Sequence, residues 1–211
     1  MIKLKEEVIV EKILDSISKS QKLYYDWNKD SIDSAPEYFL TVSILKDLAT
    51  NLNSGSVTFE WNIGQVVKTK PRRGRPKKHF NKNGRFDIAI WRDDLTPWAF
   101  IEVKRNIWTK KSATNDLERI RDSLGLDRSH NLQVGFFATY IERERTKRKN
   151  EDTKVDHFVT KYEKDWIKDV FYDSDLTYKV HKRPIKKYTI EYDKKTTFHE
   201  AFQPICVVVR K

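Results

Sequence analysis

Residues 85–104 read RFDIAIW-RDDLTPW-AFIEVK and contain the two apolar, β-prone runs that decide the fold of this chain. Side chains alternate between the two faces of a strand, so Glu102 and Lys104 lie on the same face of the second run. Asp87 interrupts the first run in the same way. A charge inside a buried strand is costly unless it is paired or binds a metal. If the two runs pair, these side chains therefore converge at one site.

The overall charge favours a polyanionic partner. The chain has 211 residues, with 42 Lys and Arg against 31 Asp and Glu, which gives a formal net charge of +11. Nucleic acid is the simplest partner for such a protein, although composition alone does not separate it from an anionic membrane surface. A hydrophobic content of 38% excludes a disordered polycation and supports a sizeable core.

Cysteine and histidine give no sign of a zinc site. Cys206 is the only cysteine and lies in an apolar run typical of a core strand, so a disulfide within the chain is excluded. The five histidines are scattered without metal-ligating spacing. No apolar run is long enough to span a bilayer, and no secretory signal is recognisable, so we expect a cytoplasmic, DNA- or nucleoid-associated protein without a membrane partner.

Apolar periodicity predicts helices at residues 5–24, 34–52, 113–124 and about 153–171. The second helix carries the clearest start signal. Ser34 would be its N-cap, Pro36 would lie in its first turn, and Glu37 stands three residues after the serine, which is a capping-box pattern.

Apolar or alternating segments predict strands at residues 57–67, 85–91, 99–104, 133–140, 185–192 and 204–209. The strands are not regularly separated by helices, so a doubly wound parallel sheet is disfavoured. We expect an α/β protein of α+β character, with a mixed β-sheet flanked by helices. It would form a single domain over residues 1–211, with its core at about 34–140 and an added helix and short strands at about 150–211.

Within residues 34–140, a helix with Glu37, a strand with Asp87 and a strand with Glu102-Val103-Lys104 follow one another in that order. This arrangement resembles the PD-(D/E)XK nuclease superfamily, whose restriction-endonuclease-like fold occurs in many restriction and repair enzymes. The proline that this family places before the aspartate is Phe86 here.

The resemblance implies a metal-dependent endonuclease that hydrolyses phosphodiester bonds in duplex DNA. Asp87 and Glu102 would supply oxygen ligands to Mg²⁺ or Mn²⁺, and the Val103 carbonyl is a further candidate ligand. Lys104 would orient or help deprotonate the attacking water, and Glu37 would complete the catalytic residues. Without metal, repulsion between the two acids should raise the pKa of one of them.

Simpler interpretations stay open for the same residues. Glu102 and Lys104 could form a solvated ion pair, and Asp87 could pair with Arg85 at an exposed strand start. The capping box by itself would explain Glu37.

Three residues that follow Lys104 in the sequence are expected to have structural roles. Asp116 and Arg119 suggest a solvated helix face more than a contact with phosphate or with the site. Trp108 suggests core packing more than stacking on a base.

A basic segment at residues 68–85 contains nine Lys or Arg and no acid. Its centre, PRRGRPKK at 71–78, looks like an AT-hook, which lies extended in the minor groove of A·T-rich DNA. Contacts to phosphates without sequence preference are the simpler alternative. The candidate nucleic-acid-binding residues are Arg72, Arg73, Arg75, Lys77 and Lys78.

Three other functions compete with the DNA endonuclease. The first is a non-catalytic DNA-binding protein on a nuclease-like fold, and the second is a nuclease of this fold that acts on RNA or on single strands. The third is a basic interaction module with no nucleic-acid role. A homodimer would allow both strands of a duplex to be cut.

Overall fold

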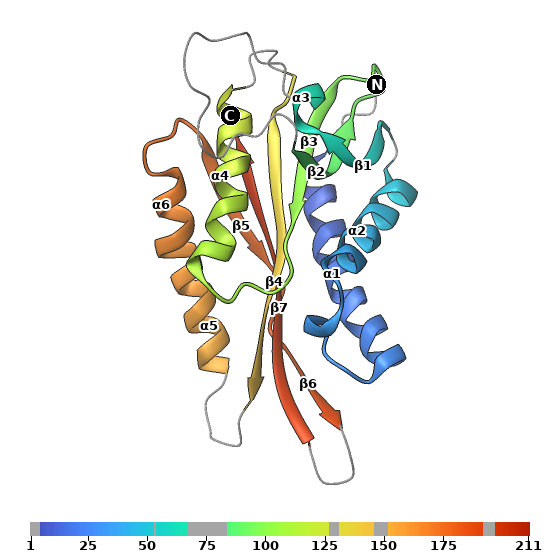
Figure 1. Cartoon of the computed structure of the whole chain (residues 1–211), viewed down its shortest axis with the longest axis vertical. Helices are drawn as coiled ribbons and strands as arrows, with labels where there is room; N and C mark the ends of the chain where they lie inside the picture. The colour runs from blue at the N-terminus through green and yellow to red at the C-terminus, as the bar shows by residue number, and fades with distance from the viewer. Residues whose placement is uncertain (1–4, 53, 67–83, 127–130, 146–151, 192–196) are drawn as a thin grey trace.

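A seven-stranded mixed sheet forms the middle layer of the molecule (Figure 1). The computed structural model describes the chain except residues 1–4, 53, 67–83, 127–130, 146–151 and 192–196. The strands are β1 Ser56–Asn62, β2 Arg85–Trp91, β3 Pro97–Val103, β4 Val134–Arg145, β5 Thr177–Lys182, β6 Lys186–Glu191 and β7 Thr197–Arg210. Their order is β1-β2-β3-β4-β7-β5, and β6 pairs separately with β7. β3 and β4 are parallel, and the other described pairs are antiparallel.

Helices cover both faces of this sheet (Figure 1). They are α1 Glu6–Asn28, η1 Ile32–Ser34, α2 Glu37–Asn51, α3 Ile63–Val66, α4 Lys110–Leu126, α5 Asp152–Lys161, the π-helical turn η2 Tyr162–Ile167 and α6 Lys168–Phe171. On one face α1 and α2 bury residues such as Ile13 and Ile44 against the sheet. On the other face α4, α5 and η2 do so with Leu117, Val159 and Trp166. The mixed α/β fold of α+β character is therefore confirmed.

The predicted order of core elements is also confirmed. From α2 onward the chain forms β1, β2, β3, α4 and β4, apart from the four-residue helix α3 between β1 and β2. In the described part of the chain, none of the helices has the length and apolarity needed to cross a membrane.

Several boundaries differ from the sequence prediction. The strand expected at 57–67 ends at Asn62, where α3 begins. The strand expected at 133–140 continues to Arg145, because β4 pairs with β7 along its whole length. Strand β5 carries no apolar run and alternates only between exposed and half-buried residues, so hydrophobic patterning does not predict it.

The start of α2 does not form the expected capping box. Ser34 ends the short turn η1, and Pro36 has extended backbone before Glu37 opens the helix without a side-chain cap. Ser31 caps the preceding turn instead, since its hydroxyl accepts a hydrogen bond from the backbone N–H of Asp33 at 2.9 Å. The prediction was wrong because proline at 36 holds an extended backbone, which separates Ser34 from the helix. The Glu37 carboxylate is left for another partner.

Close packing between α4 and β4 depends on Gly135. A Cβ atom added there would lie 2.5 Å from Cγ2 of Ile120 on α4 and 3.1 Å from Cζ of Phe100 on β3. The absence of a side chain at this position lets α4 lie directly on the sheet. This contact also determines how closely the helix approaches β3, where Glu102 lies.

We expect Gly135→Ala to lower the free energy of unfolding by about 1–3 kcal/mol, because the added methyl group overpacks a closed interior. Urea denaturation of the two proteins measures this difference. Gly125→Ala is the matched control, since a Cβ at Gly125 on α4 meets nothing within 4 Å. That variant should be as stable as the parent or more stable, because alanine is the better helix former. Equal stability of Gly135→Ala and the parent would contradict this account of the packing.

Candidate active site

Asp87 and Val103 join β2 and β3 where their main-chain pairing ends. The described register of the two strands runs from Trp91 opposite Pro97 to Ile88 opposite Ile101. Beyond that pair, Asp87 Oδ2 accepts a hydrogen bond from the backbone N–H of Val103 at 2.7 Å. The carboxylate thus takes the place of a main-chain acceptor, which fixes it beside the end of β3.

Glu102 lies in the interior rather than on a solvated strand face. All seven residues of β3 are buried, and Glu102 is 1% exposed. Its Oε2 accepts a hydrogen bond from Nη2 of Arg119 on α4 at 2.6 Å. The same nitrogen donates to Oδ1 of Asp116 at 2.8 Å, so one guanidinium pairs with two carboxylates. A buried carboxylate with such a partner is not the solvated ion pair that the sequence left open.

Lys104 and Glu37 form the other half of the cluster. Lys104 Nζ lies 3.1 Å from Glu37 Oε2, with the two side chains 32% and 42% exposed. The backbone N–H of Arg105 donates to the same Glu37 oxygen at 3.0 Å. The Arg105 guanidinium also donates to the Ala35 carbonyl at 3.0 Å. These bonds tie the segment after β3 to the start of α2.

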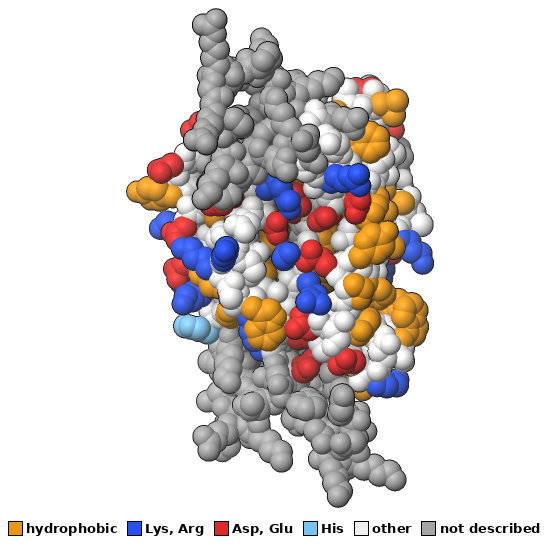
Figure 2. Space-filling view, viewed as in Figure 1, with side chains coloured by type: hydrophobic (Ala, Val, Ile, Leu, Met, Phe, Trp, Pro, Cys, Tyr) orange, Lys and Arg blue, Asp and Glu red, His pale blue; other side chains and the backbone are white. Residues whose placement is uncertain are grey.

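The structure therefore brings the predicted site residues Asp87, Glu102, Val103, Lys104 and Glu37 together. On the face shown in Figure 2, acidic and basic side chains gather in the middle, over the region between α2 and α4 of Figure 1. The alternative pairing of Asp87 with Arg85 is wrong, because Arg85 pairs with Glu60 at 2.7 Å.

The expectation for α4 was wrong in an informative way. Asp116 and Arg119 were expected on a solvated helix face, yet their side chains are only 17% and 31% exposed, and Arg119 pairs with both Asp116 and the buried Glu102. Their spacing of three residues places both on one side of the helix. The sequence did contain a signal for this contact. An acid and an arginine three residues apart occur in the helix that directly follows the strand with Glu102.

Burial raises the pKa of three carboxyl groups in the cluster. It raises the pKa of Asp87 to about 6, although the hydrogen bond from Val103 and the charge of Arg119 act in the opposite direction. Burial also raises the pKa of Glu102 well above its ordinary value, and repulsion from Asp87 adds a smaller contribution. The pKa of Asp116 is raised for the same reason. The sequence predicted such a shift from repulsion, but desolvation is the larger cause.

The cluster contains more acids than cations. Its members are Glu37, Asp87, Glu102 and Asp116, with Lys104 and Arg119 as the cations. If every group were ionised, four negative and two positive charges would leave a net charge of −2. In a buried setting that excess is tolerated only if protons or another cation neutralise it.

The oxygen atoms of this cluster fit a hard divalent cation. Glu102 Oε1 is buried and has no hydrogen-bond partner in the part of the chain that the structure describes. Asp87 uses Oδ2 for its bond to Val103, and Oδ1 accepts no hydrogen bond from the described residues. Over those same residues, no group of three or more His, Cys, Asp or Glu side chains could hold a metal ion. Mg²⁺ is commonly bound by one or two carboxylates, with water and substrate phosphate as its other ligands, so Asp87 and Glu102 are the residues that could hold such an ion.

The remaining predicted residues fall elsewhere. Arg72, Arg73, Arg75, Lys77 and Lys78 lie outside the described residues. Trp108 is 55% exposed, so the expected packing of its ring in the core is wrong.

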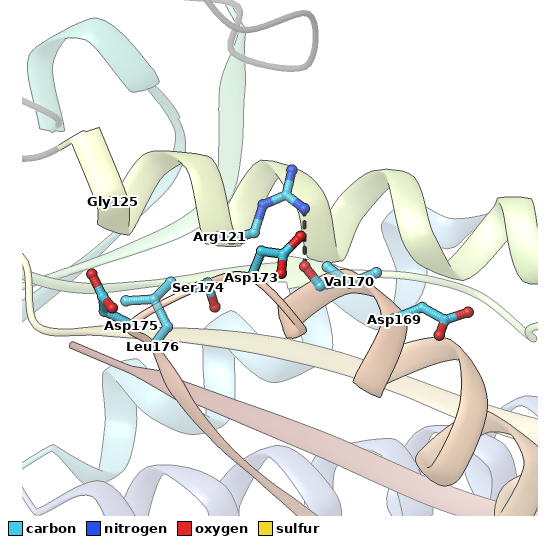
Figure 3. Close-up of a pocket in the computed structure, with 8 residues that line it drawn as sticks. All are labelled: Arg121, Gly125, Asp169, Val170, Asp173, Ser174, Asp175 and Leu176. Carbon is cyan, nitrogen blue, oxygen red and sulfur yellow. Dashed lines mark hydrogen bonds between the residues drawn. The ribbon is translucent and has the colours of Figure 1, made fainter.

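A cavity of about 500 Å³ opens elsewhere, beside α4 and the segment after α6 (Figure 3). Asp169, Asp173 and Asp175 line it, and Arg121 donates a hydrogen bond to the Val170 carbonyl at 2.9 Å. Its lining includes none of the predicted site residues, and its carboxylates would repel a phosphate. The cavity is therefore separate from the candidate site.

No match was found when the sequence was compared with protein-family models, with curated proteins and with solved structures. Function must therefore be inferred from the geometry and chemistry of this chain.

The raised pKa of Asp87 predicts a pH-dependent stability in the absence of metal. The ordinary pKa of 3.8 rises to about 6 in the folded protein, which therefore holds this proton more tightly than the unfolded chain. Its contribution to stability is full below pH 3.8 and is lost as the pH rises through 6. Asp87→Asn keeps the side chain neutral, so at pH 8 we expect its free energy of unfolding to exceed that of the parent by up to about 3 kcal/mol.

Urea denaturation in EDTA at pH 4, 6 and 8 measures this difference, which should shrink towards pH 4. Asp94→Asn is the control, because Asp94 lies in an exposed turn and hydrogen bonds from Thr96 lower its pKa. That variant should show no gain at pH 8. If Asp87→Asn is less stable than the parent at pH 8, burial of the ionised Asp87 carboxylate does not destabilise the folded protein, and this account is contradicted.

Proposed function

We propose that this protein is a metal-dependent phosphodiesterase of the PD-(D/E)XK nuclease type that cleaves duplex DNA. The observation that carries the proposal is the buried Glu102, whose Oε1 has no hydrogen-bond partner among the described residues, beside Asp87 on the adjacent strand. An unsatisfied buried carboxylate oxygen is costly in a purely structural role. The order α2, β1, β2, β3, α4, β4, with the short α3 between β1 and β2, supports the same proposal, because it agrees with the order of elements on which the resemblance to that family rests.

Asp87 and Glu102 are the residues that would hold Mg²⁺ or Mn²⁺, with the Val103 carbonyl as a further candidate. A bound divalent cation polarises the phosphate and lowers the pKa of a bound water. Its charge would also offset the net −2 of the ionised cluster, which connects the excess of acids to the cofactor.

Arg119 has a positioning role in this proposal. Its 2.6 Å bond to Glu102 Oε2 leaves Oε1 as the oxygen that is free to bind a ligand, since Oε1 has no hydrogen-bond partner among the described residues. Because the guanidinium also bonds Asp116, the side chain is held from two sides and fixes the orientation of the Glu102 carboxylate.

Lys104 is the cation suited to contact the substrate. Its ammonium group is partly exposed, and Glu37 holds it beside the end of β3. From there it can orient the attacking water or offset the negative charge that develops on the phosphate. Glu37 thus acts through Lys104, whereas Arg119 acts through Glu102.

DNA is the substrate that the charge of the whole chain favours. The net charge of +11 attracts a polyanion to a site whose own groups are mainly acidic. The basic segment at 68–85 precedes and overlaps the start of β2, so it is attached directly to the strand that carries Asp87. A protein that meets chromosomal or plasmid DNA in the cytoplasm fits these features.

Cleavage of supercoiled plasmid and of a linear duplex tests the proposal. With Mg²⁺ or Mn²⁺ the parent should cut, and with EDTA it should not. Glu102→Gln and Asp87→Asn should each reduce the rate by more than about 100-fold, because each removes a charged ligand while keeping its shape. Asp156→Asn, which changes an exposed acid on α5, is the control and should cut like the parent.

Each outcome distinguishes a competing function. DNA binding without cleavage in all four proteins would favour the non-catalytic DNA-binding protein. Faster cleavage of matched RNA or single-stranded DNA would assign a different substrate to the same site. An absence of any binding near physiological salt would favour the interaction module.

The basic segment generates a separate prediction about binding. Each phosphate neutralised on B-DNA contributes about −0.9 to the slope of log K against log salt concentration. Arg73→Ala combined with Arg75→Ala should therefore weaken duplex binding and flatten this slope by about 1.8. Fluorescence anisotropy in EDTA over a series of salt concentrations gives the slope directly.

Lys22→Ala combined with Lys46→Ala is the matched control. These two exposed lysines on α1 and α2 carry the same total charge. If both double variants flatten the slope equally, the segment makes no local contact and only the net charge of the protein matters.

A further inference from the structure

Trp108 is an exposed aromatic side chain held in a fixed position near the candidate active site. It is 55% exposed and lies in the segment between β3 and α4. The Arg143 guanidinium lies 4.1 Å from the centre of its ring and 4.2 Å from the centre of the Phe158 ring. Arg143 therefore stacks between two aromatic rings and covers one face of Trp108. With Arg143 over the ring, 55% of the residue is still exposed.

Hydrogen bonds hold Arg143 in this stack. Its Nη1 donates to the Glu142 carbonyl at 2.6 Å and to Asn106 Oδ1 at 3.1 Å, and its Nη2 donates to the Ile107 carbonyl at 2.7 Å. Phe158 packs in turn against Trp166, with 5.1 Å between ring centroids. Phe158 and Trp166 thus anchor the stack in the core, and Trp108 is its outermost ring.

The backbone that carries Trp108 is also fixed. The Asn106 side chain is buried, accepts a hydrogen bond from the Glu142 N–H at 3.0 Å and donates to the Glu142 carbonyl at 3.1 Å. The Asn106 side chain thus bonds both main-chain groups of one β4 residue, as a paired residue on a neighbouring strand would. It holds the segment after Lys104 along the edge of β4, so the ring does not need to be ordered when a ligand binds.

The distance from Lys104 to Trp108 fits a nucleic-acid strand. Trp108 is four positions after Lys104, so in a fully extended chain their Cα atoms would be at most about 14 Å apart. Stacked nucleotides rise about 3.4 Å each, so this span corresponds to no more than about four nucleotides. Residues 104–111 also contain four Lys or Arg and no acid, which suits contacts to the backbone of the same strand.

From this geometry we infer that the exposed ring of Trp108 stacks on an unpaired nucleobase of the strand that is cut, within about four nucleotides of the scissile phosphate. A base inside a regular duplex is already stacked on both sides, so this site selects a bulged, mismatched, frayed or extruded nucleotide. The inference rests on the proposed function. It adds a preference of substrate structure that the metal-binding carboxylates do not supply.

Equilibrium binding in EDTA tests the inference independently of cleavage. The probes are a duplex with a single-nucleotide bulge and the same duplex with an abasic nucleotide at the bulge. The parent should bind the base-containing bulge about 5- to 150-fold more tightly, which is the range for stacking one base on an aromatic side chain. Trp108→Ala should bring this ratio close to 1, and Trp108→Phe should retain part of it.

Tyr172→Ala is the control, because Tyr172 is 78% exposed after α6 and lies on a different segment. It should keep the ratio of the parent. A ratio near 1 for the parent, or an undiminished ratio for Trp108→Ala, would overturn the inference. Cleavage of the same bulged duplex with Mg²⁺ then tests the nuclease proposal separately, since a stacking ratio without cleavage would support base stacking on Trp108 but reject the proposed function.

Discussion

The contact between Glu102 and Arg119 is the interaction on which the rest of the site depends. Glu102 lies in a strand that is buried over its whole length, so its carboxylate has no water to stabilise it. Arg119 supplies a cation across the interface between β3 and α4, at a distance of 2.6 Å. Removing one partner of such a pair leaves an uncompensated buried charge, which is more costly than the pair itself is favourable. The position of α4 on the sheet is therefore coupled to the presence of the acid.

This contact explains why the surrounding groups titrate unusually. One guanidinium shared by Glu102 and Asp116 cannot fully compensate both acids, and Asp87 lies beyond it with its own raised pKa. In the absence of metal, protons on these carboxyl groups reduce the excess negative charge. A divalent cation would replace those protons, so metal binding and proton release should be coupled. A chain with a formal net charge of +11 thus keeps a strongly acidic cluster in its interior.

The sequence predicted the parts of this arrangement that depend on local patterning. The apolar runs around Asp87 and Glu102 are β2 and β3, and the acids that interrupt them come together at the end of these strands. Partners that come from distant segments were not predictable in the same way. Arg119 is separated from Glu102 by 17 residues, and only the packing of α4 on the sheet brings them together. Apolar periodicity predicts which face of a helix is buried, but it does not predict which charged side chain of another element that face will contact.

Local signals also failed where tertiary contacts were stronger. The capping box at Ser34 is absent, and Glu37 bonds Lys104 and the Arg105 N–H, which lie 67 and 68 residues further along the chain. Trp108 has the residue type of a core position, but Arg143 holds it at the surface. β5 lacks an apolar run because it lies at the edge of the sheet, beyond β7, and buries little of its surface. In each case the missing information was the identity of a partner far away in the sequence.

The most direct test of the central claim is the number of protons released when Mn²⁺ binds at pH 6. Titration calorimetry in two buffers with different ionisation enthalpies gives this number without any substrate. If Asp87 and Glu102 bind the metal after giving up protons, the parent should release about one to two protons per ion, and Glu102→Gln should lose most of the binding. Mn²⁺ binding that releases no protons, or that is unchanged in Glu102→Gln, would contradict the assignment of these two carboxylates as the metal site.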